Sequence, residues 1–336
     1  MTYGATAGVD IGGTKIRAAV VTADGEVVAS ATAPTPRGGA AMLDVAAGLV
    51  DRAVAAAGRG MGHGAGSGVG SGAGSGAGRA GVTAVGVGAA GVVDPVTGEV
   101  LAASDSFTGW VGTDLRAGLA SRTGLPVTAA NDVDAFLVGE ATWGAVRGVR
   151  SAAGIALGTG VGGALWLDGA LYRGAGAAGE IGHMPGFGDA VCTCGQRGHL
   201  ETLASGRSVE RRYAEAVGAE AGVGGVSAGV VPGSASALGA AEIEALARAG
   251  DPAAVRVFAD AGHAVGSAVL VVAALLDVGH VVVGGGLARA WDLLEPALLA
   301  RLREAPPVSG HPVEVRHAAL GGDATVVGAA ALARRA

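Results

Sequence analysis

Residues 7–21 read AGVDIGGTKIRAAVV, two short apolar runs separated by a glycine turn. Bounded in this way, the runs are typical of strands, and we expect one at Ala7–Asp10 and a second at Ile16–Val21. Asp24-Gly25 separates the second run from a third, Val27–Thr32, and an Asp-Gly pair between apolar runs indicates a hairpin. The chain therefore begins with strands joined by tight turns.

The rest of the chain alternates between strand and helix patterns. Further strands are expected at 83–91, 126–132, 152–158, 280–286 and 313–320. Helices are expected near 40–57, 114–123, 135–146, 207–217, 241–249, 252–276, 290–304 and 324–335. This alternation predicts an α/β protein, and its two halves predict two domains with a cleft between them.

Composition excludes several classes of partner. The net charge of −6 over 336 residues disfavours a nucleic-acid partner, which needs a basic face, and gives no support for an anionic membrane surface. The most apolar stretch, AVGSAVLVVAALL at 264–276, is too short to span a bilayer and indicates a buried helix. No targeting segment is visible at the N-terminus, and the two cysteines, Cys192 and Cys194, cannot make a disulfide framework. We therefore expect a cytoplasmic protein.

Two stretches are too rich in glycine to contribute to a core. Residues 58–81 repeat Gly, Ser and Ala, and such a segment buries too little apolar area to offset its chain entropy. We expect a flexible loop there, with His63 exposed and without a role. A second Gly/Ala-rich stretch covers 218–239.

Three glycine turns follow expected strands. Glycine lets the backbone approach a ligand closely, and such turns direct N–H groups at anions. The candidate phosphate-binding residues are Asp10, Gly12, Gly13, Thr14, Gly158, Thr159, Gly160, Gly284 and Gly285. Asp10, at the end of its strand, is placed to hold Mg²⁺ or its water. No G-x-x-x-x-G-K-[ST] motif is present, and residues 158–163 fit G-x-G-x-x-G but precede a strand, which argues against a dinucleotide site.

Polar residues follow one further expected strand and recur in the stretch 179–201. Asn131-Asp132 stands at a strand–helix junction, where Asp132 is either a simple helix cap or, beside a phosphate site, a candidate base. Glu180, His183 and Glu201 add donors and acceptors suited to a polyol. The same stretch, GEIGHMPGFGDAVCTCGQRGHLE at 179–201, contains both cysteines and two of the seven histidines.

Together these motifs resemble the ROK family of bacterial sugar kinases and repressors. GEIGH and CTCGQRGHLE are similar to the family's G-E-x-G-H and C-x-C-G-x-x-G-C-x-E, and NDVDAFLVGE is similar to N-D-x-N-A-x-x-x-G-E. The resemblance implies two RNase H-like domains of the actin and hexokinase type around a cleft. It makes Asp132 the catalytic base, Asn131, Glu180, His183 and Glu201 sugar ligands, and Gly91 and Ser104 further sugar contacts.

The resemblance also implies a structural Zn²⁺ held by His183, Cys192, Cys194 and His199, because four N/S ligands close a tetrahedral site. The alternative is two buried free cysteines beside two incidental histidines. His199 replaces the family's third cysteine, Asp134 its second Asn, and SFTGW at 106–110 stands for N-L-P-G-W. These departures bear on metal affinity and on which sugar fits.

The expected function is ATP- and Mg²⁺-dependent phosphorylation of a hexose, glucose first, at its primary hydroxyl. An N-acetylmannosamine, N-acetylglucosamine or fructose kinase is the alternative within the class. A sugar-responsive repressor is disfavoured by the glycine turn so near residue 10 and by the negative charge, and an inactive sugar-binding module by Asp132. The resemblance implies an N-terminal domain of residues 1–130 joined by helix 324–336, a C-terminal domain of 131–323 with its zinc loop at 183–199, and a homodimer or homotetramer.

Overall fold

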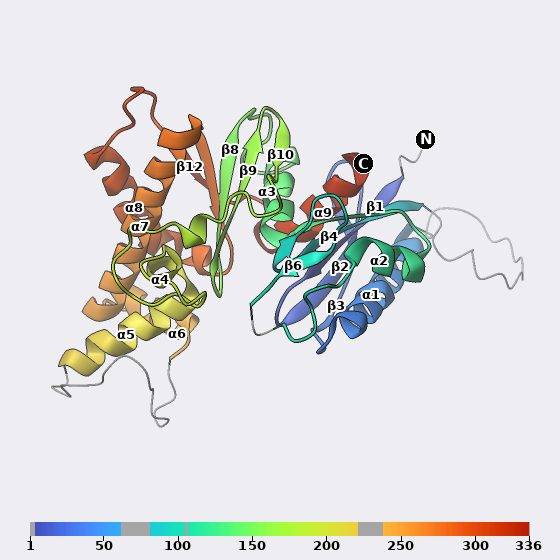
Figure 1. Cartoon of the computed structure of the whole chain (residues 1–336), viewed down its shortest axis with the longest axis horizontal. Helices are drawn as coiled ribbons and strands as arrows, with labels where there is room; N and C mark the ends of the chain where they lie inside the picture. The colour runs from blue at the N-terminus through green and yellow to red at the C-terminus, as the bar shows by residue number, and fades with distance from the viewer. Residues whose placement is uncertain (1–3, 62–80, 105–106, 221–237, 336) are drawn as a thin grey trace, which may run out of the picture. The chain divides into compact units, whose positions relative to one another are not determined.

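The computed structural model describes residues 4–61, 81–104, 107–220 and 238–335 (Figure 1). It contains two five-stranded sheets covered by helices, so the predicted α/β class is confirmed. The predicted glycine loop at 58–81 is wrong at its start, because helix α1, Gly39–Met61, continues through the first four of these residues. The remainder of that loop, with His63, and the centre of the 218–239 stretch lie outside the described residues.

The first sheet has the order β3-β2-β1-β4-β7. Its strands are β1 (Ala5–Ile11), β2 (Lys15–Val21), β3 (Val27–Pro34), β4 (Val82–Ala89) and β7 (Val127–Asn131). β1, β2 and β3 pair antiparallel, as their tight turns require, whereas β4 and β7 run parallel to β1. Ile11 aligns with Ala89 and Ala89 with Asn131, so β1, β4 and β7 end at one edge of the sheet.

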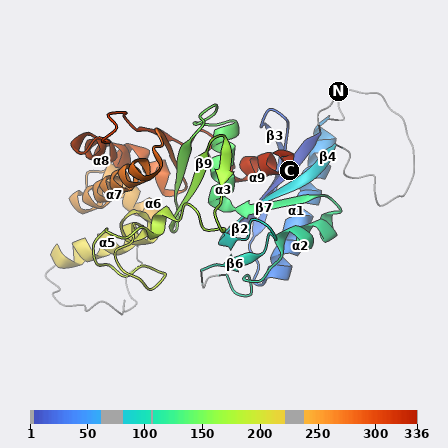
Figure 2. The ribbon, with the colours of Figure 1, turned by 45° about the horizontal axis from the view of Figure 1, so that its top comes forward.

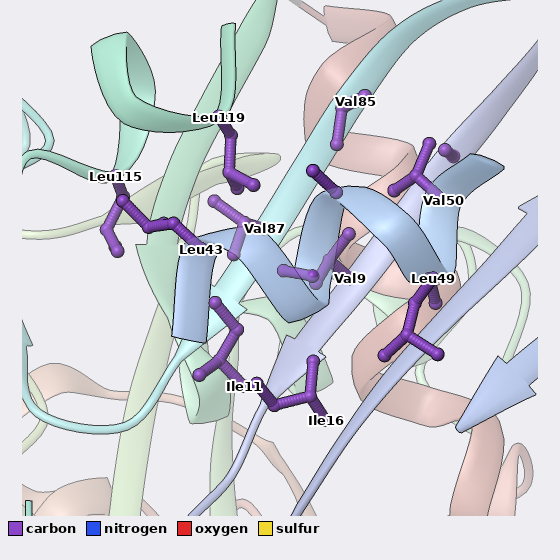
Figure 3. Close-up of a cluster of buried hydrophobic side chains, with 14 of the residues drawn as sticks. Val9, Ile11, Ile16, Leu43, Leu49, Val50, Val85, Val87, Leu115 and Leu119 are labelled. Atoms are coloured by element: carbon purple, nitrogen blue, oxygen red, sulfur yellow. The ribbon is translucent and has the colours of Figure 1, made fainter. Parts of the chain in front are cut away.

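One face of this sheet packs on α1 and on α2, Leu115–Thr123. Side chains alternate along a strand, and Val9 and Ile11 of β1 and Ile16 of β2 are directed to this side (Figure 3). Leu43, Leu49 and Val50 of α1 and Leu115 and Leu119 of α2 complete this buried aliphatic core. With aromatic residues at only 3 % of the chain, the core is built mainly from Val, Leu, Ile and Ala, with Trp110 and Met42 among them.

The other face packs on α9, Ala324–Arg335, which also contacts α3, Asp132–Thr142 (Figure 2). Glycine makes this approach close. A Cβ at Gly8 of β1 would lie 1.8 Å from the carbonyl oxygen of Val326, and one at Gly86 of β4 would lie 1.7 Å from that of Ala329. The C-terminal helix is therefore seated directly on the backbone of the N-terminal sheet.

The second sheet repeats the order of the first, as β10-β9-β8-β11-β12. Its strands are β8 (Ala152–Leu157), β9 (Val161–Leu167), β10 (Ala170–Tyr172), β11 (His280–Gly284) and β12 (Glu314–His317). The helices of this half are α4 (Glu201–Ala204), α5 (Gly206–Glu220), α6 (Ala240–Arg248), α7 (Pro252–Leu276) and α8 (Trp291–Glu304). A small ribbon, β5 (Val92–Val93) with β6 (Val100–Ala102), belongs to the first half.

The chain divides into two compact units. Unit 1 contains residues 1–150, 164–178 and 318–336, and unit 2 contains 151–163 and 179–317. The C-terminal helix α9 thus belongs to unit 1 together with the N-terminal sheet. The division predicted at residues 130 and 131 differs from this one, and two domains around a cleft stay a prediction.

Helix α7 is the one described helix long and apolar enough to cross a membrane, with a mean hydropathy of 1.7 over its most apolar window. Half of that window is buried, and α7 contacts α8, α6, α5 and α4. A core helix passes the same test of length and composition, so this is weak evidence for a membrane span. The helix predicted as buried at 264–276 is buried only in part, because Val271, Leu275 and Leu276 near its end are exposed.

Candidate functional site

Asp10 and Asp132 lie at the same edge of the first sheet. Asp10 is near the end of β1, and Asp132 opens α3 directly after β7. Burial, together with the neighbouring Asp132 carboxylate, raises the pKa of Asp10 to about 7, against the opposing charges of Lys15 and Arg17. Burial likewise raises the pKa of Asp132, against hydrogen bonds from Val133 and Asn131. Two carboxyl groups so close together favour a proton or a cation between them.

Asn131 performs the capping role that the sequence left open for Asp132. Its Oδ1 accepts the backbone N–H groups of Val133, at 2.7 Å, and Asp134, so Asn131 is the N-cap of α3 and the helix begins three residues earlier than expected. The interpretation of Asp132 as a simple cap is therefore wrong. Asp132 is the first helical residue, and its Oδ1 also accepts the N–H of Val133, at 3.0 Å.

Of the other predicted sugar contacts of unit 1, Gly91 lies beside Asn131. Asn131 Nδ2 donates to the carbonyl of Gly91 at 2.8 Å, and Gly91 adopts a φ of 105° that favours glycine. Ser104 is exposed, and its carbonyl accepts the N–H of Phe107. Trp110, which sequence reasoning passed over, is fully buried and donates its indole N–H to Ala90 at 2.8 Å. It thereby supports the backbone next to Gly91.

Most of the first glycine turn is exposed to solvent. Gly12 N–H donates to Lys15 O at 3.1 Å, which closes the turn, while Gly13, Thr14 and Lys15 are exposed. Lys15 was not among the predicted residues. Its positive charge lowers the pKa of Asp10. The only sequence feature that could have identified Lys15 is its position as a basic residue directly after the turn.

The second and third glycine turns lie at neighbouring strand ends in unit 2. Gly158–Gly160 follows β8, with the N–H of Gly158 donating to Gly160 O at 2.9 Å. Gly284 ends β11, which runs parallel to β8. Gly285 has a φ of 93°, and a Cβ there would lie 2.4 Å from the carbonyl oxygen of Leu157. Both turns therefore expose backbone at one edge of the second sheet.

The four predicted metal ligands come together in unit 2. The ligand atoms of His183, Cys192, Cys194 and His199 all lie within 4.8 Å of one another. The Nδ1 atoms of His183 and His199 are 3.3 Å apart, Cys194 Sγ is 3.3 Å from His199 Nδ1, and Cys192 Sγ is 3.8 Å from His183 Nδ1. Ligands of a tetrahedral zinc ion are separated by roughly 3.3–3.8 Å at ordinary bond lengths.

The chemistry of these donors also fits Zn²⁺. Both cysteines are free thiols, and burial raises the pKa of the Cys192 thiol, so a thiolate there needs a cation beside it. Glu180 Oε2 lies 3.9 Å from the second ring nitrogen, Nε2, of His183. A carboxylate near that nitrogen is a usual neighbour of a metal-bound imidazole.

Glu201 lies between this cluster and the glycine turn after β8. Its Oε1 accepts the hydroxyl of Thr193 at 2.6 Å, and its Oε2 accepts the N–H of Val161 at 3.0 Å. The structure thus forms two groups. Asp10, Gly91, Asn131 and Asp132 are gathered in unit 1, and the cluster, Glu180, Glu201 and the second and third turns are in unit 2.

Comparisons with known proteins agree with the family resemblance. A model of the ROK family matches residues 74–336. A glucokinase from Streptomyces coelicolor is 34 % identical over 337 residues, covering 98 % of this chain and 98 % of that protein.

Two solved structures are similar over nearly the whole chain. One is a ROK family glucokinase from Streptomyces griseus in complex with glucose and AMPPNP, with a TM-score of 0.78 and 34 % identity, covering 99 % of this chain and 100 % of that one. The other is a ROK hexokinase from Thermus thermophilus, with a TM-score of 0.74 and 30 % identity, covering 98 % of both chains. The expected fold, RNase H-like and of the actin and hexokinase type, is confirmed, and the chain belongs to the ROK family.

Proposed function

We propose that this chain is an ATP-dependent sugar kinase that phosphorylates a hexose, glucose first, at its primary hydroxyl. The observation that carries the proposal is the pair of carboxyl groups, Asp10 and Asp132, at one sheet edge. It is supported by relatives named as glucokinases, one of them solved with glucose and AMPPNP. Phosphoryl transfer asks a protein mainly for positioning, charge neutralisation and a base, and these residues are suited to supply them.

Asp132 is the proposed general base. It takes the proton of the attacking hydroxyl, and its raised pKa brings the carboxylate nearer to the strength that a base needs at neutral pH. Asn131 fixes the first turn of α3 and so the direction of the Asp132 side chain. Asn131, Gly91 and Ser104 in unit 1, and Glu180, His183 and Glu201 in unit 2, are the proposed partners of the sugar hydroxyls.

Asp10 and the three glycine turns form the proposed nucleotide side. Asp10 would hold Mg²⁺ or its water, and that ion would neutralise charge on the transferred phosphoryl group. The backbone N–H groups at 12–14, 158–160 and 284–285 would bind phosphate oxygens. Lys15, exposed beside Asp10, adds a positive charge to the same edge.

His183, Cys192, Cys194 and His199 would hold a structural Zn²⁺, which when bound cross-links the loop and leaves no open position for chemistry. His183 would be a ligand through Nδ1, the atom nearest the other donors, which would leave its Nε2 for a hydroxyl or for Glu180. The free thiols suit a reducing cytoplasm, where we place the protein. Assembly as a homodimer or homotetramer stays a prediction.

The test is ADP release measured with glucose, mannose, fructose, N-acetylglucosamine and N-acetylmannosamine, each with ATP and Mg²⁺. We expect the highest kcat/KM with glucose. A clear preference for fructose or an N-acetylated sugar would replace glucose but keep the kinase. No turnover with any sugar, by metal-replete protein that binds ATP, would contradict the proposal.

A further inference from the structure

Thr193 stands between the two cysteines, and its hydroxyl is the only part of the Cys-Thr-Cys segment that donates a short hydrogen bond to Glu201 within the described residues. That bond is 2.6 Å long, whereas Cys192 Sγ lies 3.8 Å from the same carboxylate oxygen. A hydroxyl bound to a carboxylate is a charge-assisted hydrogen bond, among the stronger kinds in proteins. Thr193 therefore orients the carboxylate of Glu201.

The other oxygen of that carboxylate reaches the second glycine turn. Glu201 Oε2 accepts the N–H of Val161, the first residue of β9, at 3.0 Å. A Cβ at Gly160 would lie 2.4 Å from Oε2, so the turn is in direct contact with the carboxylate. In addition, Gly206 N–H donates to Gly158 O at 2.8 Å. The turn is held between the first residue of α5 and one glutamate.

We propose that Thr193 is a positioning residue for the nucleotide: through Glu201 it links the metal cluster to the Gly158–Gly160 turn and sets how well that turn binds a phosphate group. Holding Cys192 and Cys194 fixes the backbone of Thr193 between them, and the Thr193–Glu201–Val161 chain carries that order to the turn. The inference rests on the proposed function only in naming a nucleotide phosphate as the ligand.

The structural link is tested by hydrogen exchange at the Val161 amide, measured by NMR on the zinc-loaded protein. Thr193→Val keeps the shape of the side chain but removes the hydroxyl. We expect exchange at Val161 to accelerate about three- to tenfold, the effect of losing one hydrogen bond of ordinary net strength. Thr193→Ser keeps the hydroxyl and should exchange as the wild type does. Zinc content, measured in each protein, should stay unchanged.

Removal of zinc by a chelator completes the test. In the wild type we expect chelation to accelerate exchange at Val161, and re-addition of zinc to reverse it. In Thr193→Val, chelation should add little, because the link is already cut. Equal acceleration by chelation in both proteins, or unchanged exchange in Thr193→Val, would overturn the inference.

Affinity for AMPPNP, measured by calorimetry, supplies the functional readout. We expect Thr193→Val to bind it about three- to tenfold more weakly, in proportion to the lost order of the turn, and Thr193→Ser to bind it normally. Unchanged affinity in Thr193→Val would overturn the role in nucleotide binding. A wild type that binds no nucleotide would instead contradict the proposed function, and the exchange measurements would still decide whether the link exists.

Discussion

At the scale of single residues, two carboxylates of one sequence motif differ in their surroundings and therefore in the roles that they can have. Asp132 and Asp134 are two residues apart in one motif, yet Asp134 is buried in the first turn of α3, whereas Asp132 is partly exposed at the sheet edge beside Asp10. Asn131 is the N-cap of the helix, whereas Asp132 accepts only the N–H of Val133 next to it. Because β7 ends at Asn131, Asn131 becomes the N-cap and Asp132 the first residue of α3.

Asp132→Asn tests the proposed base. The amide still forms hydrogen bonds but cannot accept the proton, so we expect kcat to fall by more than about 100-fold while sugar affinity changes little. Steady-state kinetics and sugar titration measure the two effects. Asp114→Asn is the control, because Asp114 caps α2 through Ala117 N–H in the same unit and Asn caps equally well. A kcat near that of the wild type would remove Asp132 from the role.

Asp10→Asn tests the electrostatics of the pair. The folded chain raises the pKa of Asp10 from 3.8 to about 7, so it binds this proton more tightly than the unfolded chain does. Stability from this source is complete below about pH 4 and is lost as the pH rises to about 7, which costs up to about 4 kcal/mol. Without divalent cations, the change in the free energy of unfolding caused by Asp10→Asn should therefore be more stabilising at pH 8 than at pH 4.5. Urea unfolding at the two pH values measures it.

Asp94→Asn gives a control of opposite sign for that measurement. Backbone hydrogen bonds from Thr97 and Val96 lower the pKa of Asp94, so its contribution is present at neutral pH and lost on acidification. An Asp10→Asn effect of the same size at both pH values would show that burial of Asp10 does not disfavour its charge.

At the scale of elements, glycines decide how α9 meets its neighbours. Gly328 of α9 faces α3, and a Cβ there would lie 1.7 Å from the carbonyl oxygen of Ala135. With Gly8 and Gly86 on the sheet, it lets the helix approach backbone on two sides. The contacted atoms are backbone atoms of helices and strands. They cannot move aside for a side chain without displacing the whole element.

Gly328→Ala should therefore destabilise the protein by about 3 kcal/mol or more, as expected when a helix pair must separate to admit a methyl group. Gly48→Ala is the matched control. Gly48 also lies inside a helix, α1, but a Cβ there meets nothing within 4 Å, so alanine should stabilise by about 0.5–1 kcal/mol. Urea unfolding measures both free energies, and equal effects would contradict the close packing of α9.

The loop at 183–199 is the second element whose behaviour can be tested. The wild type should contain about one Zn²⁺ per chain, and His199→Cys should keep it, because thiolate is an equally good ligand. His199→Ala leaves three protein ligands and should lower zinc content and raise the KM for sugar. Metal analysis and kinetics measure these outcomes. A fully active wild type without metal, or normal zinc and KM in His199→Ala, would contradict the site.

The sequence predicts most elements but not their closest contacts. Periodicity and turns located the strands of the first sheet and β8, β11 and β12 of the second, but they missed β10. The family resemblance named the four residues that cluster as candidate metal ligands. The sequence prediction placed helix residues 58–61 in a loop, because Gly58 and Gly60 have a low helix propensity that tertiary packing overrides here. It also missed the Thr193–Glu201 bond, which depends on side-chain direction rather than on spacing.

At the scale of the whole chain, one buried carboxylate joins segments far apart in sequence. Glu140, at the C-terminal end of α3, is fully buried. It accepts N–H groups from Ala145 at 2.7 Å, Ala319 at 3.1 Å and Leu320 at 2.9 Å. The chain leaves unit 1 after Arg150 and finally returns to it at Ala318, so Glu140 binds unit 1 close to both places. These bonds explain why β12 ends at His317, three residues before the predicted end.

Glu140→Gln tests this closure of unit 1. The variant keeps the shape of the side chain, but its NH₂ group must face backbone N–H groups that now donate to the carboxylate. Leaving these buried donors without acceptors should lower the free energy of unfolding by about 2–4 kcal/mol in total. Glu26→Gln, in an exposed turn of the same unit, should change the free energy of unfolding by less than about 0.5 kcal/mol. Urea unfolding measures both variants.

Hydrogen exchange then locates the Glu140→Gln effect. Because Ala319 and Leu320 directly precede α9, the loss of their bonds should release that segment, and protection should fall in α3 and α9 together while α7 of unit 2 keeps its own. Asp132 opens α3, so kcat should fall with this protection although Glu140 is eight positions further along the helix. If protection falls equally in α7, Glu140 supports only the global stability of the protein. If protection falls nowhere, the N–H groups of Ala319 and Leu320 have found other partners, and the closure of unit 1 does not depend on Glu140.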